Sequence, residues 1–237
     1  NIMEKKFILT EDTCLVEGRT LYRIEAVKDF GRVKKGNLGG FVEKETNLSH
    51  EGNSWVYDNA FVYGDACVYD NARICGNAHI HGNTCIYGNA YVYGNAPMWD
   101  DVHIYDNAHV YDNACIYGNA RIYDDAHVYG DAYIYDDAHV YDDAHVYGNA
   151  YIYDNAYIYG NACIYDAACI YGNARVYGDA HVCDDARVYG DTYIYGNAYV
   201  CDSTSIYGNA NVYGNAYVCD KANVQFSRLR TDLRKDI

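Results

Sequence analysis

Residues 103–126 read HIYDNA, HVYDNA, CIYGNA and RIYDDA, which is one six-residue pattern written four times. The pattern extends in both directions without an insertion and fills residues 55–222 with 28 hexads. A typical hexad contains a variable residue, Val or Ile, Tyr, Gly or Asp, Asn or Asp, and Ala. Unbroken repetition at a short period predicts a solenoid, because each repeat can bury its apolar residues only by stacking on its neighbours.

The order of residues within a hexad predicts a short strand followed by a corner. Side chains alternate along a strand, so the aliphatic residue and the Ala two positions before it point to one side. The Tyr and the variable residue flank the aliphatic residue and point to the other side. Gly, Asn and Asp tolerate the positive φ that a tight corner requires. We therefore expect Val, Ile and Ala inside the solenoid and Tyr outside.

The number of hexads in one coil follows from residues that break the pattern. Such residues recur every 18 positions, namely Cys183, Cys201 and Cys219 in the third place of the hexad and His109, His127 and His145 in the first. Eighteen residues make three hexads, so the coil is a triangle. The prediction is an all-β parallel β-helix of about nine coils, roughly 45 Å long at ~4.8 Å per coil.

Both ends of an open solenoid expose core and unpaired strand edges, so we expect a cap at each end. Residues 3–54 are predicted to form a small β cap, with a turn near Glu17 and Gly18, and an irregular starter coil. Residues 55–222 form the β-helix. Residues 223–237 are predicted to form a C-terminal capping helix, because Leu229, Leu233 and Ile237 have helical spacing.

Charge and hydropathy exclude several classes of function. The net charge of −15 argues against direct binding of nucleic acid, or of an anionic membrane, through a basic surface. No apolar run approaches the 18 residues of a membrane-spanning helix, and no secretory signal follows the first residues. The ten Cys follow the repeat rather than a disulfide framework. We expect a cytoplasmic protein with reduced thiols.

The repeat resembles that of the hexapeptide-repeat superfamily, whose pattern is an aliphatic residue, a small or acidic residue, two free positions, a small residue and one free position. Residues 116–121 (IYGNAR) match at the aliphatic, Asn and Ala positions, whereas Tyr117 replaces the small or acidic residue. The leader, with DFG at 29–31 and GNLGGFV at 36–42, resembles the opening of uncharacterised bacterial and phage-encoded proteins of this type. The resemblance covers residues 29–222. It implies a left-handed β-helix, an exception to the right-handed crossover rule.

Many members of this superfamily are acyl- or acetyltransferases that work as trimers, so the resemblance implies a transferase as one candidate function. Such enzymes need a His as general base beside a thioester and an acceptor. His50, His79 and His81 lie where the repeat is least regular, and they are the catalytic candidates under this hypothesis. Transferases of this type usually build the site with a loop that leaves the helix. No hexad in residues 55–222 is interrupted, so we favour a chain without a catalytic site.

Two rows of side chains are candidates for metal binding, and both have simpler explanations. A row of imidazoles on successive coils offers parallel ligands rather than a closed coordination shell. A row of corner carboxylates repels itself unless solvent or a cation such as calcium intervenes, but the calcium-binding nonapeptide motif is absent. We expect solvated surface residues and no cofactor. The rows are His109, His127 and His145, and Asp106, Asp124 and Asp142.

The 30 Tyr of the chain provide the main candidate for binding. Rings on successive coils, ~4.8 Å apart, fall in the range of offset aromatic stacking. A broad face of Tyr suits contact with a protein or a carbohydrate, since Tyr supplies large contact area at low entropic cost. The predicted binding residues are Tyr111, Tyr129, Tyr147 and Tyr165 on one wall, and Tyr117, Tyr135, Tyr153 and Tyr171 on another.

Three hypotheses about function therefore follow from the sequence, in this order. The first is a non-catalytic scaffold or binding rod that uses its Tyr faces. The second is an acyltransferase-like enzyme with a site at a subunit interface, in a trimer or a dimer. The third is an acidic mimic of nucleic acid, suggested by the net charge and the rod shape. An enzyme usually breaks its repeat where the site is built, so the regularity favours the first.

Overall fold

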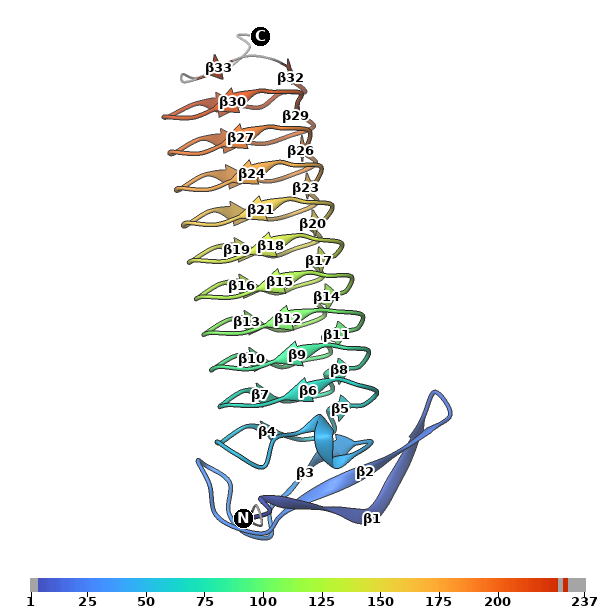
Figure 1. The fold of residues 1–237 in the computed structure, drawn as a ribbon. Helices are drawn as coiled ribbons and strands as arrows, with labels where there is room; N and C mark the ends of the chain where they lie inside the picture. Colours follow the sequence, from blue (N-terminus) through green and yellow to red (C-terminus); the bar gives the residue numbers. More distant parts are fainter. Residues whose placement is uncertain (1–3, 226–227, 230–237) are drawn as a thin grey trace.

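Each hexad in the computed structural model forms a two-residue or three-residue strand and a corner, and the coils stack into a rod (Figure 1). The structure describes residues 4–225 and 228–229. Strands in successive coils pair in parallel with a shift of 18 residues, as in Tyr133 with Tyr151 and Ile134 with Ile152. The predicted coil of three hexads is confirmed.

The first wall of the rod is a 13-stranded sheet, because the N-terminal cap is continuous with it. β1 (Phe7–Val16) and β2 (Arg19–Ala26) form an antiparallel hairpin that projects from the base of the rod (Figure 1). β2 pairs with β3 (Leu38–Val42), which pairs in parallel with β5. The other strands, each one coil further on, are β5 (Phe61–Val62), β8 (His79–Ile80), β11 (Pro97–Met98), β14 (Cys115–Ile116), β17 (Tyr133–Ile134), β20 (Tyr151–Ile152), β23 (Cys169–Ile170), β26 (Arg187–Val188), β29 (Ser205–Tyr207) and β32 (Asn223–Gln225).

The turn between β1 and β2 is where the sequence predicts it. Glu17 and Gly18 both have positive φ, 50° and 76°, as a two-residue hairpin turn requires. The only helical structure in the described part of the chain is the three-residue turn η1 (Glu45–Asn47), so no helix described there could cross a bilayer.

The second wall is a sheet of ten parallel strands. It consists of β4 (Trp55–Val56), β7 (Arg73–Ile74), β10 (Tyr91–Val92), β13 (His109–Val110), β16 (His127–Val128), β19 (His145–Val146), β22 (Cys163–Ile164), β25 (His181–Val182), β28 (Tyr199–Val200) and β31 (Tyr217–Val218).

The third wall is also a sheet of ten parallel strands. It consists of β6 (Cys67–Val68), β9 (Cys85–Ile86), β12 (His103–Ile104), β15 (Arg121–Ile122), β18 (His139–Val140), β21 (Tyr157–Ile158), β24 (Arg175–Val176), β27 (Tyr193–Ile194), β30 (Asn211–Val212) and β33 (Arg228–Leu229).

The interior of the rod contains the aliphatic residue and the Ala of each hexad, as the alternation of side chains predicts. Ile134 and Ala132 are representative, and both are inaccessible to solvent. The irregular hexad of residues 97–102 keeps this arrangement, because Met98 and Val102 occupy the two inward positions and are equally buried. The core is one continuous column of small and branched side chains, in which each coil packs on the next.

The C-terminal end differs from the prediction of a capping helix over residues 223–237. β32 pairs with β29, with Val224 beside Ile206, and β33 pairs with β30. Val224 continues the spacing of the aliphatic positions, so the backbone ladder extends for another coil. The starter strands and these last strands give about ten coils instead of nine. The remainder of the predicted helix, at 226–227 and 230–237, lies outside the described residues.

Candidate functional site

Stacked aromatic ladders run along the outside of all three walls, at the third position of each hexad. On the third wall the ladder is entirely Tyr, with centroids of adjacent rings 4.7–5.3 Å apart and ring planes within 10° of parallel. None of the residues of this ladder is among the predicted binding residues. Its members are Tyr69, Tyr87, Tyr105, Tyr123, Tyr141, Tyr159, Tyr177, Tyr195 and Tyr213.

The predicted binding residues form two further ladders. Tyr117, Tyr135, Tyr153 and Tyr171 stack on the first wall at 4.8–4.9 Å. The predicted row on the second wall stacks at 4.8–5.1 Å and consists of Tyr111, Tyr129, Tyr147 and Tyr165. Each of these rings is partly buried.

The stacking determines which part of each ring faces solvent. Near-parallel planes at these distances mean that the two faces of a ring inside a ladder are covered by its neighbours on the coils above and below. The edges and the phenol oxygens are left for solvent or a partner. Burial raises the pKa of several phenols, to about 12 for Tyr111 and Tyr153, so these hydroxyls remain protonated donors well above neutral pH.

His79 and His81 lie where the N-terminal hairpin folds against the first coils of the rod. Nε2 of His79 is 2.6 Å from Oη of Tyr63, which donates a hydrogen bond to Oε2 of Glu17 at 3.3 Å. Burial lowers the pKa of His79 and raises that of Tyr63 to about 12.

A small hollow lies beside this chain of hydrogen bonds. Its volume is about 190 Å³, and its wall includes Glu17, Arg19, Tyr63 and His81. The ring of His81 stacks on Tyr63 at 4.9 Å and 5°. The two histidines were predicted as site residues, but Glu17 and Tyr63 were not. The repeat contains no information on where the turn of the β1–β2 hairpin contacts the rod.

His50, the third catalytic candidate, is not part of this hollow. Its ring stacks on Phe7 at 4.3 Å, and its Nδ1 accepts a hydrogen bond from the backbone N–H of Lys6 at 3.0 Å. Burial lowers the pKa of His50, with the charge of Glu45 acting in the opposite direction. These contacts give His50 a structural role in the cap.

The predicted His row is a stack of parallel rings. His109 and His127 lie 4.7 Å apart, and His127 and His145 lie 4.8 Å apart, with interplanar angles of 10° and 2°. Burial lowers the pKa of His127, and its two neighbours lower it further. Parallel rings direct their nitrogen lone pairs along parallel lines, so they do not converge on one ion.

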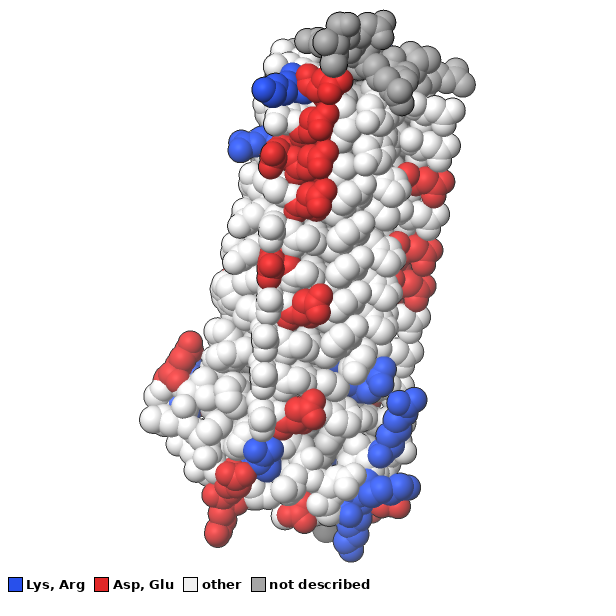
Figure 2. Space-filling model, turned by 180° about the vertical axis from the view of Figure 1, so that it is seen from behind, with Lys and Arg blue, Asp and Glu red and all other residues white. Residues whose placement is uncertain are grey.

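The predicted Asp row lines an open groove of about 840 Å³ at the corner between the third and second walls. Oδ2 of Asp106 accepts a hydrogen bond from the backbone N–H of Asp124, and Asp124 and Asp142 do the same for the following coil. One oxygen of each carboxylate is therefore already engaged. Figure 2 shows such acidic side chains in interrupted columns along the face it presents.

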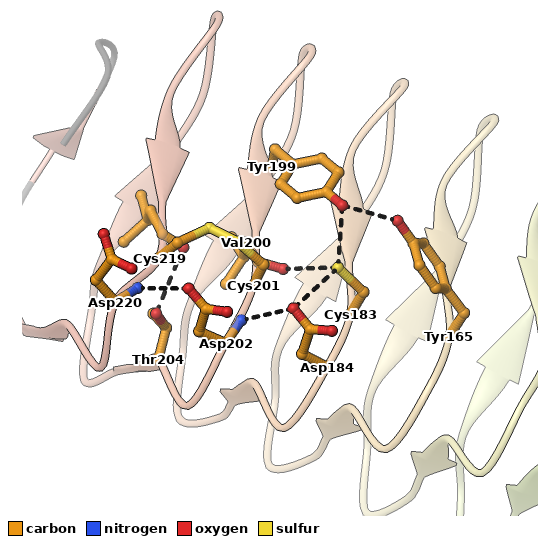
Figure 3. The surroundings of a disulfide bond; sticks show 11 residues. Tyr165, Cys183, Asp184, Tyr199, Val200, Cys201, Asp202, Thr204, Cys219 and Asp220 are labelled. Carbon is orange, nitrogen blue, oxygen red and sulfur yellow. Dashed lines mark hydrogen bonds between the residues drawn. A yellow bond between two sulfur atoms is a disulfide. The ribbon is translucent and has the colours of Figure 1, made fainter. Parts of the chain in front are cut away.

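The cysteine row at the C-terminal end of the second wall differs from the expectation of reduced thiols. Cys201 and Cys219 form a disulfide, with Cα atoms 4.7 Å apart, and Cys183 is free (Figure 3). Neighbouring coils hold Cα atoms at a separation that suits a disulfide. Stacking alone does not decide the outcome, because Cys67 and Cys85 also lie on neighbouring coils, with their Sγ atoms 3.2 Å apart, and are free thiols. The carboxylates nearby, on Asp184 and Asp202, accept backbone N–H groups of the next coil.

Comparison with known proteins finds similarity in the repeat. A family model described as "YdcK Beta solenoid repeat" matches residues 114–130 and 168–184. The chain is also similar to "Uncharacterized acetyltransferase YdcK" of Escherichia coli (strain K12), with 47% identity over 38 residues. That alignment covers 16% of this chain and 12% of the relative. Together with the stacked 18-residue coils, these matches support a β-solenoid of the hexapeptide-repeat-like kind.

Proposed function

We propose that this chain is a non-catalytic binding rod that presents its tyrosine ladders to a protein partner. The observation that carries the proposal is the ladder of the third wall, in which Tyr69 to Tyr213 stack on every coil without a substitution. The core explains why Val, Ile and Ala recur, but it does not require Tyr at an outward position.

The stacking geometry favours a protein over a carbohydrate. A sugar packs its C–H groups against an open ring face, and the faces in these ladders are covered by neighbouring rings. The surface offers instead rows of phenol hydroxyls and ring edges repeating every coil. Such rows can donate hydrogen bonds and contact apolar side chains, the combination for which Tyr is enriched in protein interfaces.

The other features of the rod fit this function. The strands continue on every coil of residues 55–222, so no loop leaves the rod there to build a cleft.

The acidic corners support the alternative hypothesis, a mimic of nucleic acid, less well than the ladders support a binding rod. Gly and Asn interrupt their columns, and carboxylates such as that of Asp124 are bonded along the rod to the next coil.

The test compares binding by variants of one wall. Changing Tyr123, Tyr141 and Tyr159 together to Phe keeps the stack and removes three hydroxyls, whereas changing them to Ser removes both. Proteins captured by the rod are quantified, and each purified candidate is titrated against the variants. We expect the affinity for the partner to fall at least several-fold in the Phe variant, and binding to be lost in the Ser variant.

The matched control makes the same Phe changes on the first wall, at Tyr117, Tyr135 and Tyr153. A partner that responds equally to both sets, or to neither, contradicts recognition by the third wall. Retention of a defined glycan by the unchanged rod, lost in the Ser variant, would replace the protein partner with a carbohydrate.

A second candidate, an acyltransferase, is favoured by the hydrogen-bond chain from Glu17 through Tyr63 to His79 and by the name of the Escherichia coli relative, an uncharacterised acetyltransferase. The chain orients a His beside a hollow that contains a cationic group, Arg19. The size of the hollow argues against an acyltransferase. Its volume of about 190 Å³ is smaller than the ~300 Å³ of the smallest typical ligand pockets. Release of free CoA from acetyl-CoA, with amine and hydroxyl acceptors, tests the idea. Turnover lost in His79→Ala but kept in His50→Ala would overturn the binding rod.

A further inference from the structure

Cys183, Cys201 and Cys219 form a three-cysteine row on consecutive coils of the second wall, where the other coils have Tyr or, at Cys75, another Cys. All three side chains are almost fully buried, and they pack as one cluster with Tyr165, Tyr199 and Tyr217. Figure 3 shows them in line along the rod. Because the row has three members, a disulfide within it leaves one cysteine as a thiol, which here is Cys183.

The spacing of the coils decides which pairs can form. Neighbouring coils place Cα atoms 4.7 Å apart, as in Cys201 and Cys219. Cys183 and Cys219 are two coils apart, roughly 9–10 Å, beyond the ~7 Å limit for a disulfide. Cys201 is therefore the shared member of both pairs that the row allows.

The row also suits the chemistry of exchange. A thiolate displaces one sulfur of a disulfide by approaching along the line of the bond that breaks. Cys183 lies on the opposite side of Cys201 from Cys219 along the row, and the three side chains pack in one cluster (Figure 3). Its thiol donates to Oη of Tyr199 at 3.4 Å, and Tyr199 lies 3.1 Å from Oη of Tyr165, which gives the proton a hydroxyl partner.

We propose that the three-cysteine row is a thiol–disulfide exchange site, in which one disulfide moves between Cys201–Cys219 and Cys183–Cys201. The sulfur of Cys183, after losing its proton, bonds to the sulfur of Cys201. The bond from Cys201 to Cys219 breaks with its electron pair, and Cys219 leaves as a thiolate that takes up a proton. The number of disulfides is unchanged, so no oxidant or reductant is consumed.

The exchange changes how the last coil of this wall is held. β31, which leads to Cys219, is the terminal strand of its sheet. In the present state the disulfide ties that strand to β28. After exchange it ties β28 to β25 instead, and Cys219 becomes a free thiol at the end of the sheet. Exchange therefore removes the covalent bond that holds the terminal strand and moves the free thiol from Cys183 to Cys219.

Tryptic peptides distinguish the two states. Cleavage after Arg175, Arg187 and Lys221 leaves Cys183 in one peptide and both other cysteines in the next. Exchange is first stopped with acid, and free thiols are then blocked with N-ethylmaleimide in denaturant, because a maleimide still reacts at a pH where thiol–disulfide exchange is slow. The disulfide Cys201–Cys219 then gives an internally linked peptide 188–221, whereas Cys183–Cys201 joins peptides 176–187 and 188–221. We expect both products from the unchanged protein, with interconversion faster at alkaline pH.

Single substitutions make the test specific, with oxidised glutathione as the probe. We expect Cys219→Ser to form Cys183–Cys201, Cys183→Ser to form Cys201–Cys219, and Cys201→Ser to form neither. The unchanged protein yielding only Cys201–Cys219 at every pH would overturn the proposal. So would a Cys219→Ser variant in which Cys183 and Cys201 stay unpaired, or a bond between Cys183 and Cys219 in Cys201→Ser.

Discussion

The carboxylate of Asp124 accepts a hydrogen bond from the backbone N–H of Asp142, one coil further along the rod, at 3.2 Å. Both residues have φ of 54°, in the left-handed region. The same bond recurs at other corners, for example from Gly160 to Asp142 at 3.0 Å. Asp therefore suits these corners for two reasons. It tolerates positive φ, and its carboxylate accepts a hydrogen bond from a backbone N–H of the next coil.

This dual role predicts the effect of changing Asp142. In Asp142→Ala the residue loses both its tolerance of positive φ, worth about 1–2 kcal/mol, and its hydrogen bond, worth about 1 kcal/mol. We expect the free energy of unfolding, from urea titration, to fall by about 2 kcal/mol.

The matched control is Asp142→Asn, because Asn keeps the acceptor oxygen and also adopts positive φ. It removes a charge from the acidic groove as well, so we expect its stability to equal or exceed that of the unchanged protein. If Asp142→Asn lowers the free energy of unfolding as much as Asp142→Ala does, the negative charge itself contributes to stability, as it would if it bound a cation. Added calcium should then protect the unchanged protein.

Alkaline pH should destabilise the rod through its Tyr ladders. Burial raises the pKa of Tyr111 and Tyr147 from 10.0 to about 12 in the folded state. Between these values the folded protein holds protons that the unfolded chain has lost. The stabilisation is therefore complete below pH 10 and is lost as the pH rises through about 12. Unfolding measured by circular dichroism should track the appearance of phenolate absorbance.

The control replaces Tyr111, Tyr129 and Tyr147 with Phe, which keeps stacked rings and removes three ionisable groups. Its stability should decline less steeply above pH 10 than that of the unchanged protein. Identical slopes would mean that ionisation of this ladder is not linked to unfolding.

The repeat explains why so much of the fold could be predicted. Once the coil is known to hold 18 residues, every residue has a neighbour at that spacing, and pairs such as Tyr133 with Tyr151 follow without further knowledge. The inward direction of Ile134 follows from strand alternation alone. The same logic predicted the ladders and the His row.

What escaped prediction lies where the repeat gives no information. The approach of Glu17 to Tyr63 depends on how a hairpin folds back over the first coil, a contact across 46 residues. The Cys row was expected to hold reduced thiols, whereas Cys201 and Cys219 form a disulfide, because the spacing of the coils gives the Cα separation but not the redox state. At the C-terminus two sequence patterns disagree, because Leu229 fits a helical spacing whereas Val224 continues the spacing of the buried aliphatic residues. The structure follows the second pattern, and both described segments there pair with strands of the preceding coil.

His50 should make the N-terminal cap sensitive to acid. Its pKa lies below 6.5 in the folded state, chiefly because of burial. Its contribution to stability is therefore present above pH 6.5 and is lost as the pH falls through the folded pKa. Protonation also removes the acceptor for the N–H of Lys6. We expect the urea midpoint to fall on acidification.

The comparison for this group is His50→Phe, which keeps a ring against Phe7 but has neither proton nor acceptor. It should cost about 1–3 kcal/mol at neutral pH, because the Lys6 N–H loses its partner. The difference in stability between the two proteins should shrink as the pH falls. A constant difference would assign the acid response to other titratable groups, such as Glu45, whose pKa is lowered by its hydrogen bond with Lys5.

Substitution in the column of buried aliphatic residues should have large and local effects. Ile134 is inaccessible to solvent and packs only against its own and neighbouring coils. Ile134→Ala should lower the free energy of unfolding by about 2–5 kcal/mol, and Ile134→Val by about 0.5–1.5 kcal/mol, because the rigid ladder cannot collapse into the cavity. Amide hydrogen exchange should become faster mainly in β14, β17 and β20, because each repeat of a solenoid is stabilised by contacts with its immediate neighbours. Equal acceleration along the whole rod would instead indicate a single cooperative unit.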